Sequence, residues 1–256
     1  MAELFLAWQG PPTGKKRLVV VKRVLPRYAE NEYFVSMFLD EANISALLQH
    51  PNIVQVIDWG DDEHGPYYAM EYVRGVDLRK LLNHCYRTKR VVPLQLALKV
   101  VVDAAAGLHS AHELRDLEGR PMQVVHRDIS LSNILVSYDG AVKVLDFGIA
   151  KAVRRRAETQ GGFRKGKISY MSPEQVRDEA LDRRSDVFSL GVVLFELSCG
   201  RRLHQADSLI EVARDLAAGR IDRPSEVHHN YPPELEAIVC KALAAKPEDR
   251  YQSAQE

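Results

Sequence analysis

Cysteine is scarce in this sequence, which has three among 256 residues and no Cys-x-x-Cys pair. An odd number of scattered thiols excludes a disulfide framework, and the missing pair spacing leaves no zinc motif. Cys85, Cys199 and Cys240 are therefore expected to be buried apolar residues of an intracellular protein. This predicts a cytoplasmic location, with membrane attachment through segments outside this sequence left open.

Charge of one sign and long apolar runs are also missing. The 35 basic residues balance 35 acidic ones, so no overall field favours nucleic acid as a partner. The longest apolar runs, 94–108 and 187–199, contain charged residues and are too short to span a bilayer, so we expect no membrane segment in this sequence. With 46% hydrophobic residues, the chain is expected to fold around a core, as one large domain or as two lobes beside a cleft.

A β-hairpin is predicted near the amino-terminal end. Residues 3–8 and 18–24 are apolar, β-branched runs that flank a turn rich in glycine and proline, a pattern typical of paired antiparallel strands. Because side chains alternate along a strand, Val20, Lys22 and Val24 share one face. Lys22 either meets an acidic partner there or extends its ammonium group to water at the sheet edge.

The next element supplies a candidate partner for this lysine. Apolar residues recur at steps of three and four between residues 30 and 48, and Glu41 lies within that stripe, which predicts an amphipathic helix. A buried carboxylate without a partner is costly, so we expect Glu41 to pair with Lys22. The alternative is an acid at the helix edge with its head group in water.

Two further strands, 53–59 and 67–72, are predicted before the pattern changes at residues 71–76. Downstream we expect helices at 94–112, 186–197, 208–218 and 233–245, and a strand hairpin at 134–145. The fold class is therefore α+β, with a small antiparallel lobe (1–72) carrying one helix, a hinge (71–76) and a larger helical lobe (77–256). The sequence starts as if within a strand and ends as if opening a helix, so we expect a domain truncated at both ends.

The residues with the clearest chemistry lie in two short motifs. Asp128 offers a carboxylate that can accept a proton, Asn133 an amide five residues later, and Asp146 a second carboxylate after an apolar strand. Phosphoryl transfer needs one acid to orient the attacking hydroxyl, and an amide with an acid to hold divalent metal on the phosphates. The His-Arg-Asp and Asp-Phe-Gly triplets that contain these acids occur in the expected order, which makes the signal specific.

These motifs resemble the catalytic domain of eukaryotic-like (Hanks-type) protein kinases, most closely the bacterial serine/threonine kinases. The resemblance runs through Val19–Lys22, Glu41, Met70–Tyr72, His126–Asn133, Asp146–Gly148, Ser172–Glu174, Asp186 and Arg250. It implies a bilobal protein-kinase-like fold over residues 1–256, with the family's first strand and glycine-rich loop missing. A start site assigned too late and a true loss of the loop both explain this difference.

The resemblance also implies how the chain would bind ATP with Mg²⁺ or Mn²⁺. Lys22 would bind the phosphates, Glu41 would hold its ammonium group, and Asp128 would orient the substrate hydroxyl. Asn133 and Asp146 would ligate the metal through oxygen atoms. Contacts to the adenine would come from Leu4, Val20, Met70, Glu71, Val73 and Leu135.

Further family positions are structural. The resemblance implies a buried ion pair between Glu174 and Arg250, which would tie the end of the loop 149–170 to the helical lobe. Asp186 would bond backbone amides around His126. We expect both contacts to support the fold rather than the chemistry.

Other positions concern regulation and charge. In the family, the residue at Arg127 binds a phosphate on the mobile loop, where the candidate acceptors are Thr159 and Ser169; a loop that is only solvated is the alternative. The sequence departs from the family at Ser130 and Lys167, where a lysine and a threonine are usual. We expect Lys167 to supply positive charge near the transferred phosphate, the alternative being one more solvated cation.

The sequence therefore predicts a serine/threonine protein kinase that transfers the ATP γ-phosphoryl group to protein hydroxyls, its own included, in bacterial signalling. Homodimer formation is left open. The alternative is a pseudokinase or nucleotide-binding scaffold that lacks the glycine-rich loop. A small-molecule kinase of the same fold is disfavoured by the Ser-Pro-Glu closure at 172–174, a peptide-docking arrangement in the family, while tyrosine specificity stays open.

Overall fold

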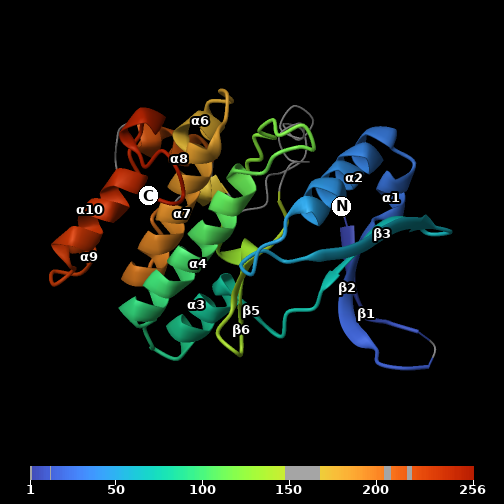
Figure 1. Cartoon of the computed structure of the whole chain (residues 1–256). Coiled ribbons are helices and arrows are strands. Elements are labelled where there is room, and N and C mark those ends of the chain that lie inside the picture. The colour runs from blue at the N-terminus through green and yellow to red at the C-terminus, as the bar shows by residue number, and fades with distance from the viewer. Residues whose placement is uncertain (1, 12, 148–167, 205–208, 218–220) are drawn as a thin grey trace.

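The computed structural model describes residues 2–11, 13–147, 168–204, 209–217 and 221–256. Figure 1 shows two regions: a sheet carrying helix α2 (Glu32–Leu47), and a mainly helical region that contains α4 (Leu94–His112) and α7 (Arg183–Cys199). This arrangement confirms the predicted α+β class. Within the described ranges, every helix is too short or too polar to cross a membrane.

The predicted amino-terminal hairpin is confirmed. β1 (Ala2–Gln9) pairs antiparallel with β2 (Arg17–Val24), and β4 (Gly65–Glu71) pairs with the other edge of β2. β3 (Val56–Asp62) completes the sheet in the order β1-β2-β4-β3. The register places Lys22 opposite Tyr68, so both side chains lie on the same face of the sheet.

The helix predicted over residues 30–48 begins slightly later. A short helix α1 (Pro26–Ala29) comes first, and α2 starts after Asn31, whose side chain accepts a hydrogen bond from the Phe34 N–H. This cap satisfies one of the free amide groups at the helix start. Glu41 is buried on α2 together with Phe38, as the apolar stripe predicts.

The strand predicted over residues 53–59 begins only at Val56. Its expected first residues bond the helical region instead: Ile53 forms a parallel bridge with Val144, and the Val54 N–H donates to the Val144 carbonyl over 2.9 Å. The Asn52 side chain adds a bond of 3.0 Å to the Val142 carbonyl. Periodicity alone could not show that these apolar residues connect the two regions rather than extend the sheet.

A second, three-stranded sheet lies at the junction with the helical region. β5 (Gly75–Asp77), β6 (Ile134–Ser137) and β7 (Val142–Val144) pair antiparallel in that order. β6 and β7 form the predicted hairpin, whereas β5 was not predicted. The backbones approach so closely there that a Cβ atom on Gly75 would lie 2.2 Å from the Val136 carbonyl oxygen, which only glycine tolerates.

Helix α3 (Leu78–Arg87), which was not predicted, starts where the Asp77 side chain accepts from the Lys80 N–H. The remaining elements are η1 (Leu131–Asn133), η2 (Ile168–Tyr170), α6 (Pro173–Val176), α8 (Leu209–Ala217), α9 (Pro224–Val227), α10 (Pro233–Ala242) and η3 (Pro247–Asp249). The predicted helices at 94–112, 186–197, 208–218 and 233–245 correspond to α4, α7, α8 and α10. The last residues, 252–256, form no helix, contrary to expectation.

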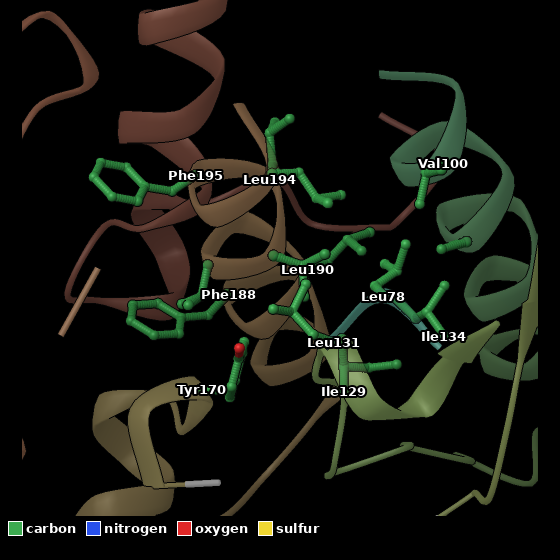
Figure 2. Packing of buried hydrophobic residues seen from close by; sticks show 14 of the residues in the cluster. Leu78, Val100, Ile129, Leu131, Ile134, Tyr170, Phe188, Leu190, Leu194 and Phe195 are labelled. Atoms are coloured by element: carbon green, nitrogen blue, oxygen red, sulfur yellow. The ribbon is translucent and has the colours of Figure 1, made fainter. Parts of the chain in front are cut away.

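The core of the helical region surrounds α7, as its uniformly apolar sequence predicts. Figure 2 shows Phe188, Leu190 and Phe195 of this helix in one cluster with Ile129 and Leu131 of the segment 126–133. Ile129 and Leu131, on either side of Ser130, are thereby packed against a buried helix.

The cysteine expectation holds at one position. Cys199 is buried, and burial raises the pKa of its thiol to about 11. Cys85 is half-buried and Cys240 is exposed, so the expected burial was wrong for Cys240. It lies on the outer side of α10, where one helix face meets solvent.

Candidate functional site

The predicted pair between Lys22 and Glu41 is present. Lys22 Nζ lies 2.7 Å from Glu41 Oε1 and 2.8 Å from Asp146 Oδ1. The Tyr68 hydroxyl also donates to Glu41 Oε1 over 2.9 Å. Burial opposes the charge on Lys22, but Asp146, Tyr68 and Glu41 outweigh it and raise the pKa of the lysine well above its usual value. The ammonium group therefore stays charged where the two regions meet.

Asp146 reaches this lysine because the chain turns sharply after β7. Its φ of +48° lies in the left-handed region, which non-glycine residues rarely adopt. Phe147 anchors the turn: it is 1% exposed, and its ring centroid lies 4.7 Å from that of His126. His126 Nε2 donates to the Leu145 carbonyl over 2.7 Å, so the two sequence motifs hold one another.

Asp128 and Asn133 are brought together by the short turn η1. Asn133 Nδ2 donates to Asp128 Oδ2 over 2.7 Å and to the Asp128 carbonyl over 2.8 Å. Both bonds use the amide nitrogen, which orients the Asn133 Oδ1 atom away from Asp128. The proposed proton acceptor is thus held by the residue proposed to ligate metal.

Asp186 fixes the backbone just before Asp128. Its carboxylate accepts from the backbone N–H groups of His126 and Arg127, over 2.7 and 2.8 Å, and bonds His112 Nε2 over 2.8 Å. Burial favours protonation, but the hydrogen bond and charge of His112 and the neighbouring His126 hold the pKa of Asp186 below its usual value. The contact predicted for Asp186 is present, whereas His112 was missed.

The donor set suits a hard divalent cation. Asp146 is a carboxylate whose side chain is 38% exposed, and Asn133 contributes an amide oxygen. Mg²⁺ and Mn²⁺ prefer such oxygen ligands and usually keep several waters. Residues Asn133 and Asp146 would therefore hold the metal, with the charged Lys22 beside it for a phosphate group.

The predicted adenine contacts are only partly gathered. Val20, Met70 and Val73 belong to one apolar cluster, together with Leu145, which the sequence analysis did not name. Leu4 is 63% exposed on β1, and Leu135 pairs with Asp77 and Lys143 in the second sheet.

Glu71 occupies a fixed position at the end of β4. Its backbone N–H donates to the Gln55 carbonyl over 2.9 Å, and its side chain accepts from the Gln55 N–H over 3.0 Å and from Lys143 Nζ over 2.6 Å. These bonds fix the backbone of Glu71 but do not test its predicted contact with adenine, which stays a prediction.

The expected pair between Glu174 and Arg250 is present and bidentate. Arg250 donates to the two carboxylate oxygens over 2.7 and 2.8 Å, and the Ser185 hydroxyl adds a bond of 2.7 Å. Burial raises the pKa of Glu174, but the hydrogen bonds from Arg250 and Ser185 outweigh it and lower the pKa to about 2. Both side chains are buried, at 4% and 0% exposure.

The candidate regulatory residues are less completely placed. Arg127 has a φ of +66°, and Ser169 is 3% exposed, so a kinase could reach its hydroxyl only after local unfolding. Thr159 and Lys167 lie outside the described residues. The Ser130 hydroxyl is buried and lies 3.0 Å from the Ser132 hydroxyl.

Three residues around the site were missed, and the sequence held a signal for one of them. Tyr68 precedes Met70 by two positions, so strand alternation places it on the same face as Met70, a predicted adenine contact. His112 could not be found in this way, because its contact with Asp186 joins two helices distant in sequence. The same is true of Gln175, whose side chain bonds the Arg127 carbonyl over 3.0 Å.

A family model described as protein kinase domain matches residues 9–256 of the chain. The chain is 48% identical over 255 residues to a protein named tyrosine-protein kinase MasK from Myxococcus xanthus (strain DK1622), a match that covers 100% of this chain and 40% of that protein. It is 39% identical over 245 residues to serine/threonine-protein kinase PknB from Mycobacterium leprae (strain TN), covering 94% of this chain and 38% of that protein. The chain thus spans about 40% of the length of these curated relatives.

The solved structures agree with the fold. A crystal structure of a mutant PknI kinase domain from Mycobacterium tuberculosis matches with a TM-score of 0.72 and 25% sequence identity. The match covers 100% of this chain and 87% of that chain. The predicted bilobal architecture is therefore confirmed by both the elements and the structural likeness.

Proposed function

The chain belongs to the protein kinase family, and from this premise we propose that it is an active serine/threonine kinase acting on protein hydroxyls with ATP as phosphate donor. One arrangement carries the proposal. Lys22, Glu41 and Asp146 form one ion network. Asn133 holds Asp128, and the Asn133 carbonyl accepts from the N–H of Leu145, the residue before Asp146. A pseudokinase that only bound nucleotide would not require Asp128 to be held by its neighbour.

In the proposed reaction, the substrate hydroxyl oxygen forms a bond to the γ-phosphorus of ATP while the bond to the β–γ bridging oxygen breaks, so that ADP leaves. Asp128 orients the hydroxyl and accepts its proton. Lys22 stays charged and positions the phosphates, and Glu41 fixes the ammonium group. Magnesium, when held by Asn133 and Asp146, would neutralise charge on the phosphates.

The class of hydroxyl is the finer part of the proposal. The name of the relative PknB supports serine/threonine specificity, whereas the name of MasK supports tyrosine as the second candidate. Ser130 adds to the second candidate, because it stands where the family's serine/threonine members usually have lysine. We favour serine and threonine because the chain's other motifs resemble the bacterial serine/threonine branch.

Analysis of the phosphorylated amino acids tests this choice directly. The purified protein is incubated with γ-labelled ATP, Mg²⁺ and a basic protein substrate, and the labelled product is hydrolysed to amino acids. Label in phosphoserine or phosphothreonine supports the proposal. Label in phosphotyrosine alone overturns the specificity, and no transfer at all supports the pseudokinase alternative.

We also retain two proposals for the loop that follows Asp146. Lys167 would place positive charge near the phosphate, so Lys167→Ala should reduce kcat roughly a hundredfold or more; equal activity would refute it. A phosphate on Thr159 would pair with Arg127 and order the loop. Mass spectrometry of active protein that shows no phosphate on Thr159 or Ser169 would remove that idea.

A further inference from the structure

A buried glutamine beside the catalytic stretch has no role in the function proposed above. Gln175 lies in helix α6, directly after Glu174, and is 3% exposed. We infer that Gln175 is a positioning residue for Asp128, because its side chain holds the peptide group that precedes this acid. The inference rests on the proposed function in so far as Asp128 orients the substrate hydroxyl.

The two ends of the Gln175 amide have chemically distinct partners. Nε2 donates to the Arg127 carbonyl oxygen over 3.0 Å, and Oε1 accepts from the Ser172 N–H over 3.0 Å. A carbonyl can only accept and a backbone N–H can only donate, so these partners fix the orientation of the amide. A carboxylate or an apolar side chain at this position could not make both bonds.

The residue that Gln175 contacts is conformationally strained. Arg127 has a φ of +66°, a conformation that costs free energy for a residue with a side chain. Its N–H donates to Asp186 Oδ1 over 2.8 Å, and its carbonyl accepts from Gln175. That carbonyl belongs to the peptide bond between Arg127 and Asp128. The two contacts together therefore fix the orientation of this peptide group, and with it the position of Asp128.

Gln175 itself stands on a rigid base. The Ser172 hydroxyl accepts from the Gln175 N–H over 3.3 Å, which completes a capping box with the bond from the Ser172 N–H to Oε1 and fixes the start of α6. The adjacent Glu174 is bound by Arg250 and Ser185. The glutamine therefore transmits the position of this buried anchor to the catalytic loop.

Gln175→Glu separates positioning from packing. One carboxylate oxygen of the new side chain still accepts from the Ser172 N–H, and the other faces the Arg127 carbonyl. When the carboxylate is ionised, this second oxygen repels the carbonyl; when it is protonated, its hydroxyl donates to the carbonyl. In mildly alkaline buffer we expect kcat to fall roughly tenfold to a hundredfold with little change in KM for ATP. In mildly acidic buffer, relative to the unmodified protein at the same pH, the loss should shrink.

Two other variants serve as comparisons. Gln175→Met has a similar volume and makes neither bond, so its loss of kcat should be the same in both buffers. Gln95→Glu introduces the same charge at an exposed position of α4 and should behave as the unmodified protein. Equal activity of Gln175→Glu and the unmodified protein in alkaline buffer, or identical pH responses of the two Gln175 variants, would overturn the inference.

Hydrogen exchange of residues 126–129, measured without nucleotide, keeps the test independent of catalysis. In alkaline buffer we expect faster exchange in Gln175→Glu than in Gln95→Glu. The melting temperatures of both variants, measured separately, should show that both are folded. If Gln175→Glu does not fold, Gln175→Met carries this comparison. Unchanged exchange in a folded variant overturns the inference. If exchange changes in the variant but the unmodified protein transfers no phosphate, the proposed function is refuted, whereas the structural role of the Gln175 contact is supported.

Discussion

Two ion-pair networks in this chain have the same chemistry but different surroundings. Lys22 joins Glu41 and Asp146 where the sheet meets the helical region, and the Asp146 side chain is 38% exposed. Glu174 and Arg250 lie within the helical region, where they are 4% and 0% exposed. The first network keeps an acid accessible beside a charged lysine, whereas the second leaves no surface for a ligand.

The difference in exposure predicts different roles, activity for the Lys22 network and stability for the Glu174–Arg250 pair. The carboxylate oxygens of Glu174 are matched by Arg250 and Ser185, so removing one partner leaves an unpaired buried charge. Lys22 instead has two acids that compete for one ammonium group, an arrangement that a phosphate can share. Variants in the first network should therefore change activity, and variants in the second should change stability.

The largest effect on activity is expected from Asp128→Asn, which keeps the shape of the side chain but cannot accept the hydroxyl proton. Phosphate transfer should fall roughly a hundredfold to ten-thousandfold, measured as initial rates with labelled ATP. The melting temperature should change little. Asp103→Asn, which affects an acid paired with Lys99 on the surface of α4, is the matched control, and an equal loss of activity there would contradict the assignment.

Glu174→Gln is expected to have the largest effect on stability. Breaking a buried pair by removing one partner costs roughly 3–5 kcal/mol, which should appear as a lower midpoint of denaturation in urea. Folded Glu174→Gln at low temperature should lose much less activity than Asp128→Asn. A variant as stable as the unmodified protein would show that the pair does not anchor the helical region.

The same carboxylate predicts how stability depends on pH. The folded-state pKa of Glu174 is about 2, against an ordinary value of 4.5, so the carboxylate stabilises the fold above pH 4.5, and this contribution is lost as pH falls towards 2. The difference corresponds to about 3 kcal/mol. Unfolding free energies measured over this range should fall less steeply in Glu174→Gln, and parallel curves would contradict the shift.

A smaller effect is expected from Glu41→Gln. The Lys22 ammonium would keep Asp146 but lose its second charged partner, so kcat/KM for ATP should fall roughly tenfold to a hundredfold. The midpoint of denaturation should fall less than in Glu174→Gln. If Glu41→Gln lost stability and kept activity, the division between the two networks would be wrong.

The smallest effect is expected at an exposed pair. Lys99 and Asp103 lie 2.7 Å apart on α4, with Lys99 56% exposed. Such pairs contribute roughly 0.3–0.5 kcal/mol, so Lys99→Met should leave both activity and the urea midpoint nearly unchanged. A large loss of stability would show that exposure is a poor guide to the role of ion pairs in this chain.

The sequence was informative where a local pattern has one structural meaning. Strand alternation and the helical stripe placed Lys22 and Glu41 on facing surfaces, and the observed 2.7 Å pair follows. The strand prediction was wrong at Ile53. This residue is of a type common in strands, but it forms a bridge with Val144 of β7 and does not extend β3. The short strand β5 was missed because three residues carry no periodicity.

Contacts between distant segments could not be predicted from residue patterns alone. Gln175 and His112 have no motif that links them to Arg127 and Asp186. Their contacts depend on how α4, α6 and the turn that carries Asp128 pack together. Cys240 was expected to be buried because cysteine usually is, yet it lies on the exposed side of α10. Residue type alone does not determine which face of a helix meets the core.

Transfer of the labelled γ-phosphate of ATP by the unmodified protein and by Asp146→Asn, at several Mg²⁺ concentrations, tests the account most directly. We predict magnesium-dependent labelling of a protein substrate by the unmodified protein, and almost none by the variant at equal folded concentration. Equal labelling by the two proteins would show that Asp146 does not serve phosphoryl transfer.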